Sequence, residues 1–268
     1  MRCAIFLLLL GNASLHGGTV AHYRFENDYT DSSGNGLDGA GNGALAFDSN
    51  VAASDDAGSS ALNATADFDY VSVSHNAAFE LQTFTLEAFV RVPTQYTNTV
   101  GTVGPNSQYI AHKLRSTSSG SFLSSYGISV DQSSSAGSNL QPGAVRATIA
   151  LSTGGISLTS NAAINDNAWH HVALTFSGTV ATLYVDGRVE DVIGGLGGSV
   201  LHGDAPFLVG SGNFAGSTSV FRRNLDGWVD EVRLTNTTLS PSEFLVVPEP
   251  STALLGCLGL AGLLLRRR

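Results

Sequence analysis

Apolar and polar side chains alternate along several short stretches of this 268-residue chain, as they do in strands with one buried face. In FTLEAFVRV (84–92) and HHVALTF (170–176), every second residue is apolar. TLYVDGRVED (182–191) places Asp-Gly between two extended runs, which is a strong signal for a β-hairpin. Further strands are predicted at 70–74, 126–130, 145–151 and 207–210.

Helical periodicity is not sustained anywhere before residue 239, and Gly, Ser and Asn separate the predicted strands. Many short strands without alternating helices predict an all-β sandwich or jelly roll and not a βαβ fold. One short helix is predicted in LSPSEF, where Ser240 can cap, Pro241 suits the first helical position and Glu243 completes a capping box. Two stretches rich in Ser, Thr and Gly are predicted to be long rim loops, 94–108 and 116–125.

The N-terminus begins MRCAIFLLLL, with Arg2 before an apolar block and small or polar residues after it. This is the layout of a secretory signal peptide, and we assign residues 1–21 to it. Gly17, Gly18 and Ala21 are all small enough for the cleavage site. The alternative, a buried first strand, is disfavoured because four consecutive leucines lack β-branching.

The C-terminus reads VPEPSTALLGCLGLAGLLLRRR. The apolar run 253–265 would span roughly 20 Å as a helix, short of the ~30 Å hydrocarbon core of a membrane. The arginines that follow it are expected on the cytoplasmic side, so we predict a marginal membrane span with a charged stop. A buried C-terminal helix is the alternative, although the run is apolar on every face. Both cysteines, Cys3 and Cys257, lie in these end segments.

The intervening domain, about residues 22–245, is acidic. The two ends carry four of the 13 basic residues and one of the 22 acidic ones, which leaves 9 basic and 21 acidic residues and a net charge of −12. A protein that binds the phosphate backbone needs the opposite balance, so nucleic acid is excluded as a partner. Acidic groups interspersed with Asn and Gly favour hard cations instead.

Three sequence blocks carry a family resemblance, together with the tail. AHYRFENDYTDSSGNGLDG, WHHVALTFSGTVATLYVDGRV and LDGWVDEVRLTNTTLSPSEF resemble, in this order, the bacterial laminin-G-like domains of the concanavalin A-like jelly-roll superfamily. The resemblance implies a jelly-roll β-sandwich over 22–245. Residues 246–268 are similar to the PEP-CTERM sorting signal, with its defining residues at Pro248, Glu249, Pro250, Arg266, Arg267 and Arg268.

The sorting signal implies export and transient retention in the inner membrane through the C-terminal helix. It further implies cleavage by an exosortase-type enzyme in an exopolysaccharide-producing Gram-negative bacterium. We therefore expect a protein that is secreted or displayed at the cell surface. Some relatives in the jelly-roll superfamily are glycoside hydrolases, so a catalytic centre must be considered.

A pair of catalytic carboxylates is not evident. Hydrolysis of a glycosidic bond needs two carboxyl groups placed across that bond. Asp230 and Glu231 are adjacent and should point to opposite faces of a strand. By the same argument His170 and His171 cannot chelate one ion together, and we expect one packed and one solvated histidine. GNGLDG (34–39) leads into no helix and is interpreted as a turn, not a dinucleotide site.

A calcium loop is the main candidate site. Asp31, Ser33 and Asn35 stand at alternate positions before a glycine, and the carbonyl of Leu37 can join them, as in the first half of an oxygen-ligand loop. The resemblance places this segment near the last strand and so suggests Asp230 as a further ligand to Ca²⁺. The alternative is a solvated turn rich in Asx residues.

The function expected from these observations is that of a non-catalytic module that binds an extracellular polysaccharide or surface glycan. A structural or adhesive matrix protein without a saccharide site is the second hypothesis, and a glycosidase of the same fold is the third. Saccharide sites generally need exposed aromatic rings beside polar groups. Four aromatic residues lie in or beside the predicted loops and are either such platforms or core residues at strand ends, Tyr96, Tyr109, Phe122 and Tyr126.

Overall fold

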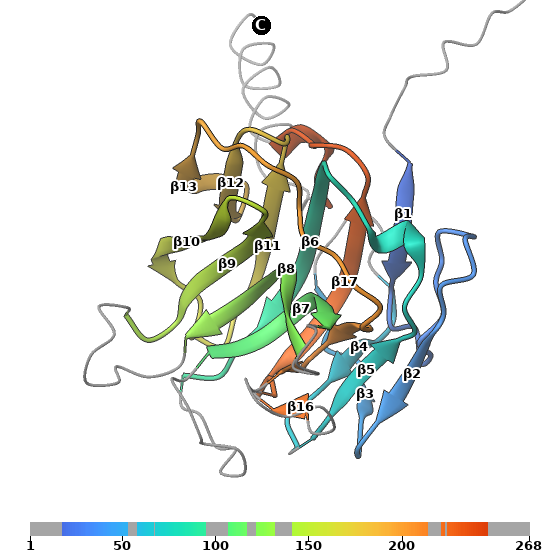
Figure 1. Ribbon diagram of the computed structural model, residues 1–268. Helices are drawn as coiled ribbons and strands as arrows, with labels where there is room; N and C mark the ends of the chain where they lie inside the picture. The colour runs from blue at the N-terminus through green and yellow to red at the C-terminus, as the bar shows by residue number, and fades with distance from the viewer. Residues whose placement is uncertain are drawn as a thin grey trace, which may run out of the picture.

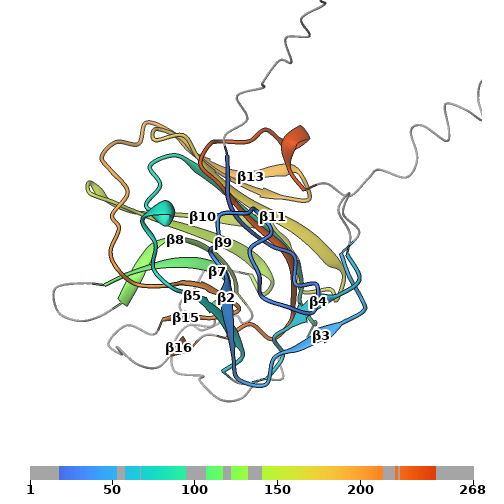
Figure 2. The same cartoon turned by 90° about the vertical axis from the view of Figure 1, so that its right-hand side faces the viewer.

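The alternating residues form two antiparallel β-sheets that pack face to face, as Figures 1 and 2 show. This computed structural model confirms the predicted all-β sandwich. Among the residues it describes, no helix is long and apolar enough to cross a membrane. The signal-peptide residues before 18 and the whole sorting signal lie outside the description. The described residues are 18–52, 58–66, 68–94, 107–116, 122–131, 141–213, 221–222 and 224–245.

The first sheet, sheet A, has the strand order β13-β12-β11-β6-β17-β4-β3, and β1 pairs with β17. It contains both chain-terminal strands of the domain. Its strands are β1 (Thr19–Tyr23), β3 (Ala46–Asp48), β4 (Ala61–Asn63), β6 (Phe84–Arg91), β11 (Trp169–Phe176), β12 (Ala181–Val185), β13 (Arg188–Ile193) and β17 (Trp228–Thr235).

The second sheet, sheet B, has the order β10-β9-β8-β7-β14-β5-β2. A small two-stranded ribbon and two 3-10 turns complete the described elements. The strands of sheet B are β2 (Gly39–Asn42), β5 (Tyr70–Val73), β7 (Ser107–Ser116), β8 (Phe122–Asp131), β9 (Ala144–Leu151), β10 (Gly154–Ala163) and β14 (Phe207–Val209). The remaining elements are β15 (Gly212–Asn213), β16 (Phe221–Arg222), η1 (Ala77–Phe79) and η2 (Pro241–Glu243).

The core lies between the two sheets and follows the alternation. On β6 the fully buried Leu86, Ala88 and Val90 point inward. From the facing sheet, the ring of Tyr126 on β8 packs 4.4 Å from that of Phe84. Full burial of one such side chain contributes roughly 1.5–3 kcal/mol to the stability of the fold. Many such side chains together hold the two sheets, whose strands contain no cysteine.

One buried residue breaks the alternation. Lys113 on β7 is the chain's sole lysine and has no exposed surface. Its Nζ donates hydrogen bonds to the carbonyls of Leu114, Gly203 and Ala205. Burial lowers the pKa of this lysine to about 8. The side chain therefore ties the segment before β14 to β7.

Strand β17 contains a bulge. It pairs with β6 over its length, and the register shifts between Asp230 and Arg233. Glu231, inside the bulge, has a φ of 49°, a left-handed conformation that is uncommon for a residue other than glycine. The bulge turns the carboxyl groups of both Asp230 and Glu231 away from the core, as their partners described below indicate. The expectation that these two residues face opposite sides is therefore wrong, because one extra residue breaks the two-residue period.

The outer strand of sheet B is covered by carboxylates. The backbone N–H of Thr159 on β10 donates to Asp191, and those of Asn161 and Ala162 donate to Glu190, at 2.9–3.0 Å. Both acids belong to β13 of the other sheet. Unpaired N–H groups on an edge strand invite another strand, and here side chains occupy them.

Several predicted boundaries are reproduced. The hairpin forms as β12 and β13, and η2 with its complete capping box confirms the short helix in LSPSEF. Three boundaries differ. β8 begins at Phe122, inside the predicted loop 116–125. β7 begins at Ser107, inside the predicted loop 94–108. β1 begins at Thr19 and pairs with Thr235, so the first strand overlaps the predicted signal peptide 1–21.

Candidate functional site

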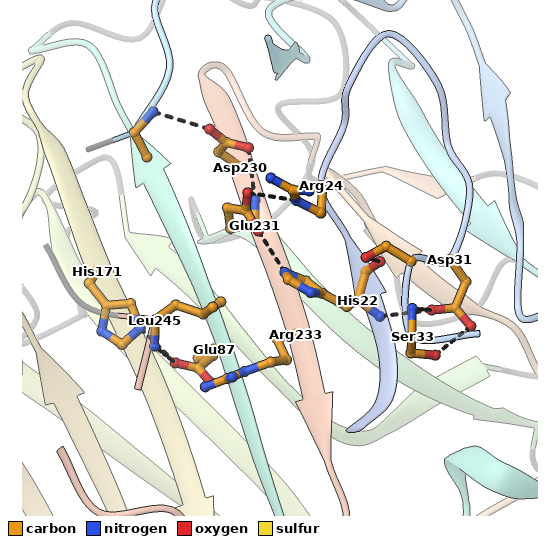
Figure 3. Close-up of polar contacts among 12 residues, drawn as sticks. His22, Arg24, Asp31, Ser33, Glu87, His171, Asp230, Glu231, Arg233 and Leu245 are labelled. Atoms are coloured by element: carbon orange, nitrogen blue, oxygen red, sulfur yellow. Dashed lines mark hydrogen bonds and ion pairs between the residues drawn. The ribbon is translucent and has the colours of Figure 1, made fainter. Parts of the chain in front are cut away.

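The outer face of sheet A carries a buried polar cluster centred on Glu87 of β6. Its neighbours in the strand face the core, so Glu87 faces outward, yet it is fully buried. It accepts hydrogen bonds from His171 Nε2 at 2.9 Å, Arg233 Nε at 2.7 Å and the amide of Leu245 at 2.9 Å (Figure 3). Burial raises the pKa of Glu87, but the His171 hydrogen bond and the Arg233 charge outweigh it and hold the pKa below its usual value.

A second carboxylate ties the first strand to the last. Glu231 in the bulge contacts His22 Nε2 at 2.6 Å and Arg24 Nε at 3.3 Å. His22 pairs with Arg233 across β1 and β17, on the outer face. Glu231 is fully buried. The bulge therefore supplies the carboxylate that contacts and fixes the N-terminal strand.

Asp230 is the third carboxylate of this face. It accepts hydrogen bonds from the amides of Ala52 at 3.1 Å and Glu231 at 2.9 Å. Burial, together with the nearby charge of Glu231, raises its pKa to about 7, although these two hydrogen bonds lower it. Figure 3 shows Asp230 apart from Asp31, with Arg24 and His22 between them. Asp230 does not join the loop that was predicted to bind calcium.

The other predicted calcium ligands lie together, but they bind one another and the backbone. The Asp31 carboxylate accepts from the amides of His22, Ser33 and Leu37 at 2.9–3.1 Å and from the Ser33 hydroxyl at 2.8 Å. The Leu37 carbonyl accepts from the hydroxyl of Tyr23 at 2.8 Å. Asn35 Nδ2 donates to the carbonyls of Thr19 and Val20.

These hydrogen bonds define a different role for the loop. Burial raises the pKa of Asp31, but the hydrogen bonds from Ser33, His22 and Leu37 outweigh it, so the pKa is lowered. Within the described ranges, no group of three His, Cys, Asp or Glu side chains is placed to hold a metal ion. The arrangement fits a turn docked on β1 better than a calcium cage, and calcium binding stays a prediction.

The adjacent histidines contact different carboxylates. His171 is buried against Glu87, whereas His170 lies between Asp186 at 2.8 Å and Asp166 at 3.1 Å. The hydrogen bond to Asp186 raises the pKa of His170 more than burial lowers it. Two separate contacts agree with the expectation that the pair does not chelate one ion.

The aromatic candidates separate into different environments. Tyr126 is fully buried and donates its hydroxyl to the Phe79 carbonyl at 2.8 Å, so it is a core residue. The half-buried ring of Tyr109 stacks 4.3 Å from that of His112. Phe122 starts β8, and Tyr96 lies outside the described residues.

Residues 237–245, here called the strap, cross the outer face of sheet A after β17. Thr85 Oγ1 donates to the Thr237 carbonyl and accepts from the Leu239 amide, both at 2.8 Å. Arg233 Nη2 donates to the Glu243 carbonyl at 2.8 Å. The nearly buried ring of Phe244 packs 5.1 Å from Tyr184 on β12 and contacts His171. The strap is thereby fixed onto strands β6, β11 and β12.

A groove of about 370 Å³ lies between the strap and the β11–β12 hairpin. We call it the strap groove. Its floor includes Thr175 and Thr182, which pair directly across the two strands. Six hydroxyl groups, one aromatic ring and one carboxylate line it. The lining residues are Thr175, Ser177, Val180, Thr182, Tyr184, Thr238, Leu239, Ser240 and Glu243.

Sequence reasoning did not find the strap groove. Its two walls lie more than fifty residues apart in the chain, and no motif connects them. The only local signal was the capping box of LSPSEF, which fixes the backbone of the strap but does not indicate what it covers.

Comparison with protein families gives two matches. Residues 65–244, more than half of the chain, match the concanavalin A-like lectin/glucanases superfamily. Residues 246–268 match the PEP-CTERM protein-sorting motif. A comparison with curated protein sequences found no match.

Solved structures of low identity share the fold. The binding domain of Paraclostridial Mosquitocidal Protein 1 is similar with a TM-score of 0.57 and 16% identity, over 84% of this chain and 50% of that one. Domain 4 of the Geobacillus stearothermophilus arabinanase AbnA, in complex with arabinotriose, is similar with a TM-score of 0.54 and 18% identity. The match covers 85% of this chain and 96% of that domain. The ligand-binding domain of botulinum neurotoxin serotype D, in complex with N-acetylneuraminic acid, is similar with a TM-score of 0.52 and 14% identity. The match covers 84% of this chain and 49% of that one.

This chain spans about half the length of the two toxin domains. These likenesses agree with the two-sheet architecture, and the family match covers most of the described sandwich. The chain belongs to the concanavalin A-like lectin/glucanase superfamily and carries a PEP-CTERM signal for sorting through the exosortase system.

Proposed function

We propose that this protein is an exported, non-catalytic glycan-binding module and that the strap groove is its saccharide site. The observation that carries the proposal is the lining of the groove, where five Ser and Thr hydroxyl groups accompany the half-buried ring and the hydroxyl of Tyr184. Hydroxyl groups both donate and accept hydrogen bonds, as sugar hydroxyls do. The volume of about 370 Å³ lies within the range of small-ligand sites.

The charge of the groove favours a neutral saccharide. Glu243 is the one charged residue in the lining, and the domain around it has a net charge of −12 from 9 basic and 21 acidic residues. A uronate or sulfated glycan would meet repulsion there. The complexes of the arabinanase domain with arabinotriose and of the neurotoxin domain with N-acetylneuraminic acid support glycan binding by this fold, without locating a site here.

The absence of catalysis is proposed from the carboxylates of β17. Asp230 and Glu231 face the same side, but each is almost fully buried and held by protein groups. A glycosidase needs two carboxyl groups that reach the scissile bond. We therefore expect no release of reducing ends from common β-glucans, galactans or alginate. A structural role without a saccharide site is the alternative.

The sorting signal supports a role outside the cell. We propose that the precursor is held transiently in the inner membrane of a Gram-negative bacterium by its C-terminal helix. An exosortase-type enzyme then releases it to an exopolysaccharide matrix. Calcium bound by the Asp31 loop is proposed only as a structural addition.

The test uses substitutions that remove single hydroxyl groups. Binding of the soluble domain to an array of neutral glycans is measured for wild type, Thr182→Val and Tyr184→Phe. One hydrogen bond contributes about 1 kcal/mol, so each variant should weaken binding roughly fivefold. Thr148→Val, the same change on β9 of sheet B, is the matched control and should bind normally.

Two results would contradict the proposal. Loss of binding in Thr148→Val alone would move the site to sheet B. Failure of the wild-type domain to bind any glycan would favour the structural role.

A further inference from the structure

The strap ends where the sorting signal begins. Its last described residue, Leu245, donates its amide to the buried carboxylate of Glu87 at 2.9 Å. Only Val246 and Val247 separate it from Pro248 of the sorting motif. The bond that processing breaks therefore lies a few residues from a segment fixed on the folded sheet.

The spacing limits how a processing enzyme can approach. An extended chain covers about 3.5 Å per residue, so Pro248 lies at most about 10 Å from Leu245. Enzymes and other proteins that recognise extended peptides pair with several consecutive residues of the main chain. Here, the amide of Leu245 and the carbonyl of Glu243 are already paired with Glu87 and Arg233.

We propose that the docked strap withholds the cleavage site, and that residues 243–245 must detach from sheet A before the processing enzyme can act. Hydrolysis breaks one peptide bond near 248–250; the hydroxyl of water joins the carbonyl carbon and its proton joins the departing amine. Processing is then governed by local opening of the strap, a process with its own free energy below that of global unfolding.

Phe244 contributes most of the apolar packing that opposes opening of the strap. It is 6% exposed and packs with Leu239 and Ala173 in a small apolar cluster separate from the main core. Its removal loosens the strap while leaving the contacts between the two sheets intact. The inference rests on processing of the sorting signal and does not depend on what the groove binds.

The experiment follows the full-length chain by pulse–chase in cells that process the wild type. Phe244→Ala should shorten the processing half-time about tenfold, which corresponds to roughly 1.4 kcal/mol of strap opening. Insertion of eight Gly and Ser residues between Leu245 and Val246 should also shorten it, because the enzyme then reaches the motif with the strap docked. Mass spectrometry of the released protein checks that the C-terminus lies near Val247.

Two controls separate the strap from other effects. Leu158→Ala removes a buried side chain of β10 in the main core, on sheet B, whereas the strap lies on the outer face of sheet A. Thr148→Val removes a hydroxyl group from β9 of sheet B, on the sheet that the strap does not cover. Both should be processed at the wild-type rate. The inference is overturned if the insertion leaves the half-time unchanged, or if Leu158→Ala shortens it as much as Phe244→Ala.

Discussion

At the scale of single residues, the pKa values of two aspartates of this domain are shifted in opposite directions. Asp31 accepts three amide hydrogen bonds and one from a hydroxyl, and these lower its pKa in spite of burial. Asp230 accepts two amide hydrogen bonds but lies beside Glu231, and burial raises its pKa to about 7. The deeper burial of Asp230, its fewer donors and the like charge of Glu231 together account for the difference.

The first prediction concerns pH. Because the pKa of Asp230 is about 7 in the folded state and near 3.9 in the unfolded state, the folded state binds more protons between these values. Stability therefore falls as pH rises from about 4 to 7. Between pH 5 and pH 8, Asp230→Asn should remove roughly 2.7 kcal/mol of this loss, which is about two pH units at 1.36 kcal/mol each, measured by urea unfolding at the two pH values.

Asp204→Asn, at an exposed carboxyl with a lowered pKa, is the control and should keep the wild-type difference between pH 5 and pH 8. An equal difference in Asp230→Asn would show that another group titrates.

The second prediction concerns calcium. If the Asp31 loop binds calcium, millimolar calcium at a hundredfold excess over Kd should raise the free energy of unfolding by about 2.7 kcal/mol. The melting temperature then rises by several degrees, at about 2–4 °C per kcal/mol. Asp31→Ala should abolish this rise, and it should also lower stability without calcium because four hydrogen bonds are lost. Asp230→Asn should leave the rise unchanged.

Differential scanning calorimetry with calcium, magnesium and EDTA provides the measurement. A melting curve that EDTA does not move would identify the loop as a hydrogen-bonded turn alone.

At the scale of elements, strands with a regular period were predictable and those with an interrupted period were not. β6 and β11 alternate regularly, and both were found from the sequence. The first residues of β7 were assigned to a loop because the stretch 94–108 is rich in Ser, Thr and Gly. The alternation of β7 is also interrupted by Lys113, which is buried with three carbonyl hydrogen-bond partners. The bulge of β17 gives no sequence signal either, because a glutamate, not a glycine, occupies its left-handed position.

The candidate sites show the same division. Asp31, Ser33 and Asn35 are close in sequence, and the structure brings them together as expected. The position of Asp230 depends on long-range register, which local pattern cannot supply. The strap groove depends wholly on such register, because its walls come from different parts of the chain.

A prediction at this scale concerns the edge of sheet B. Replacing Glu190 and Asp191 by Ala exposes three N–H groups of β10. Edge strands without such protection pair with other chains, so the double variant should self-associate at concentrations where wild type is monomeric by light scattering. The Gln and Asn variants, which retain an acceptor oxygen, should stay monomeric. Monomeric behaviour of the Ala variant would assign edge protection to another feature.

At the scale of the whole molecule, the two ends of the domain lie together. The Asn236 amide donates to the Gly18 carbonyl at 3.2 Å, and the strap begins at the next residue. Figure 1 shows the start of β1 and the last turn at one end of the sandwich, with β16 at the other. If the precursor is held by its C-terminal segment as proposed, the domain would be attached through this end, with the end that carries β16 directed away.

The enclosure of Lys113 has a practical consequence for anyone who handles the released protein. With the sole lysine fully buried, and if the predicted signal peptide is removed, the α-amine of the N-terminus is the one primary amine that a coupling reagent can reach on the folded domain. Attachment to an activated support would therefore occur through the end that carries the strap groove, since Thr19 lies in the same cross-strand row as Thr85, Thr175 and Thr182. Glycan should be the immobilised component, with the protein left in solution.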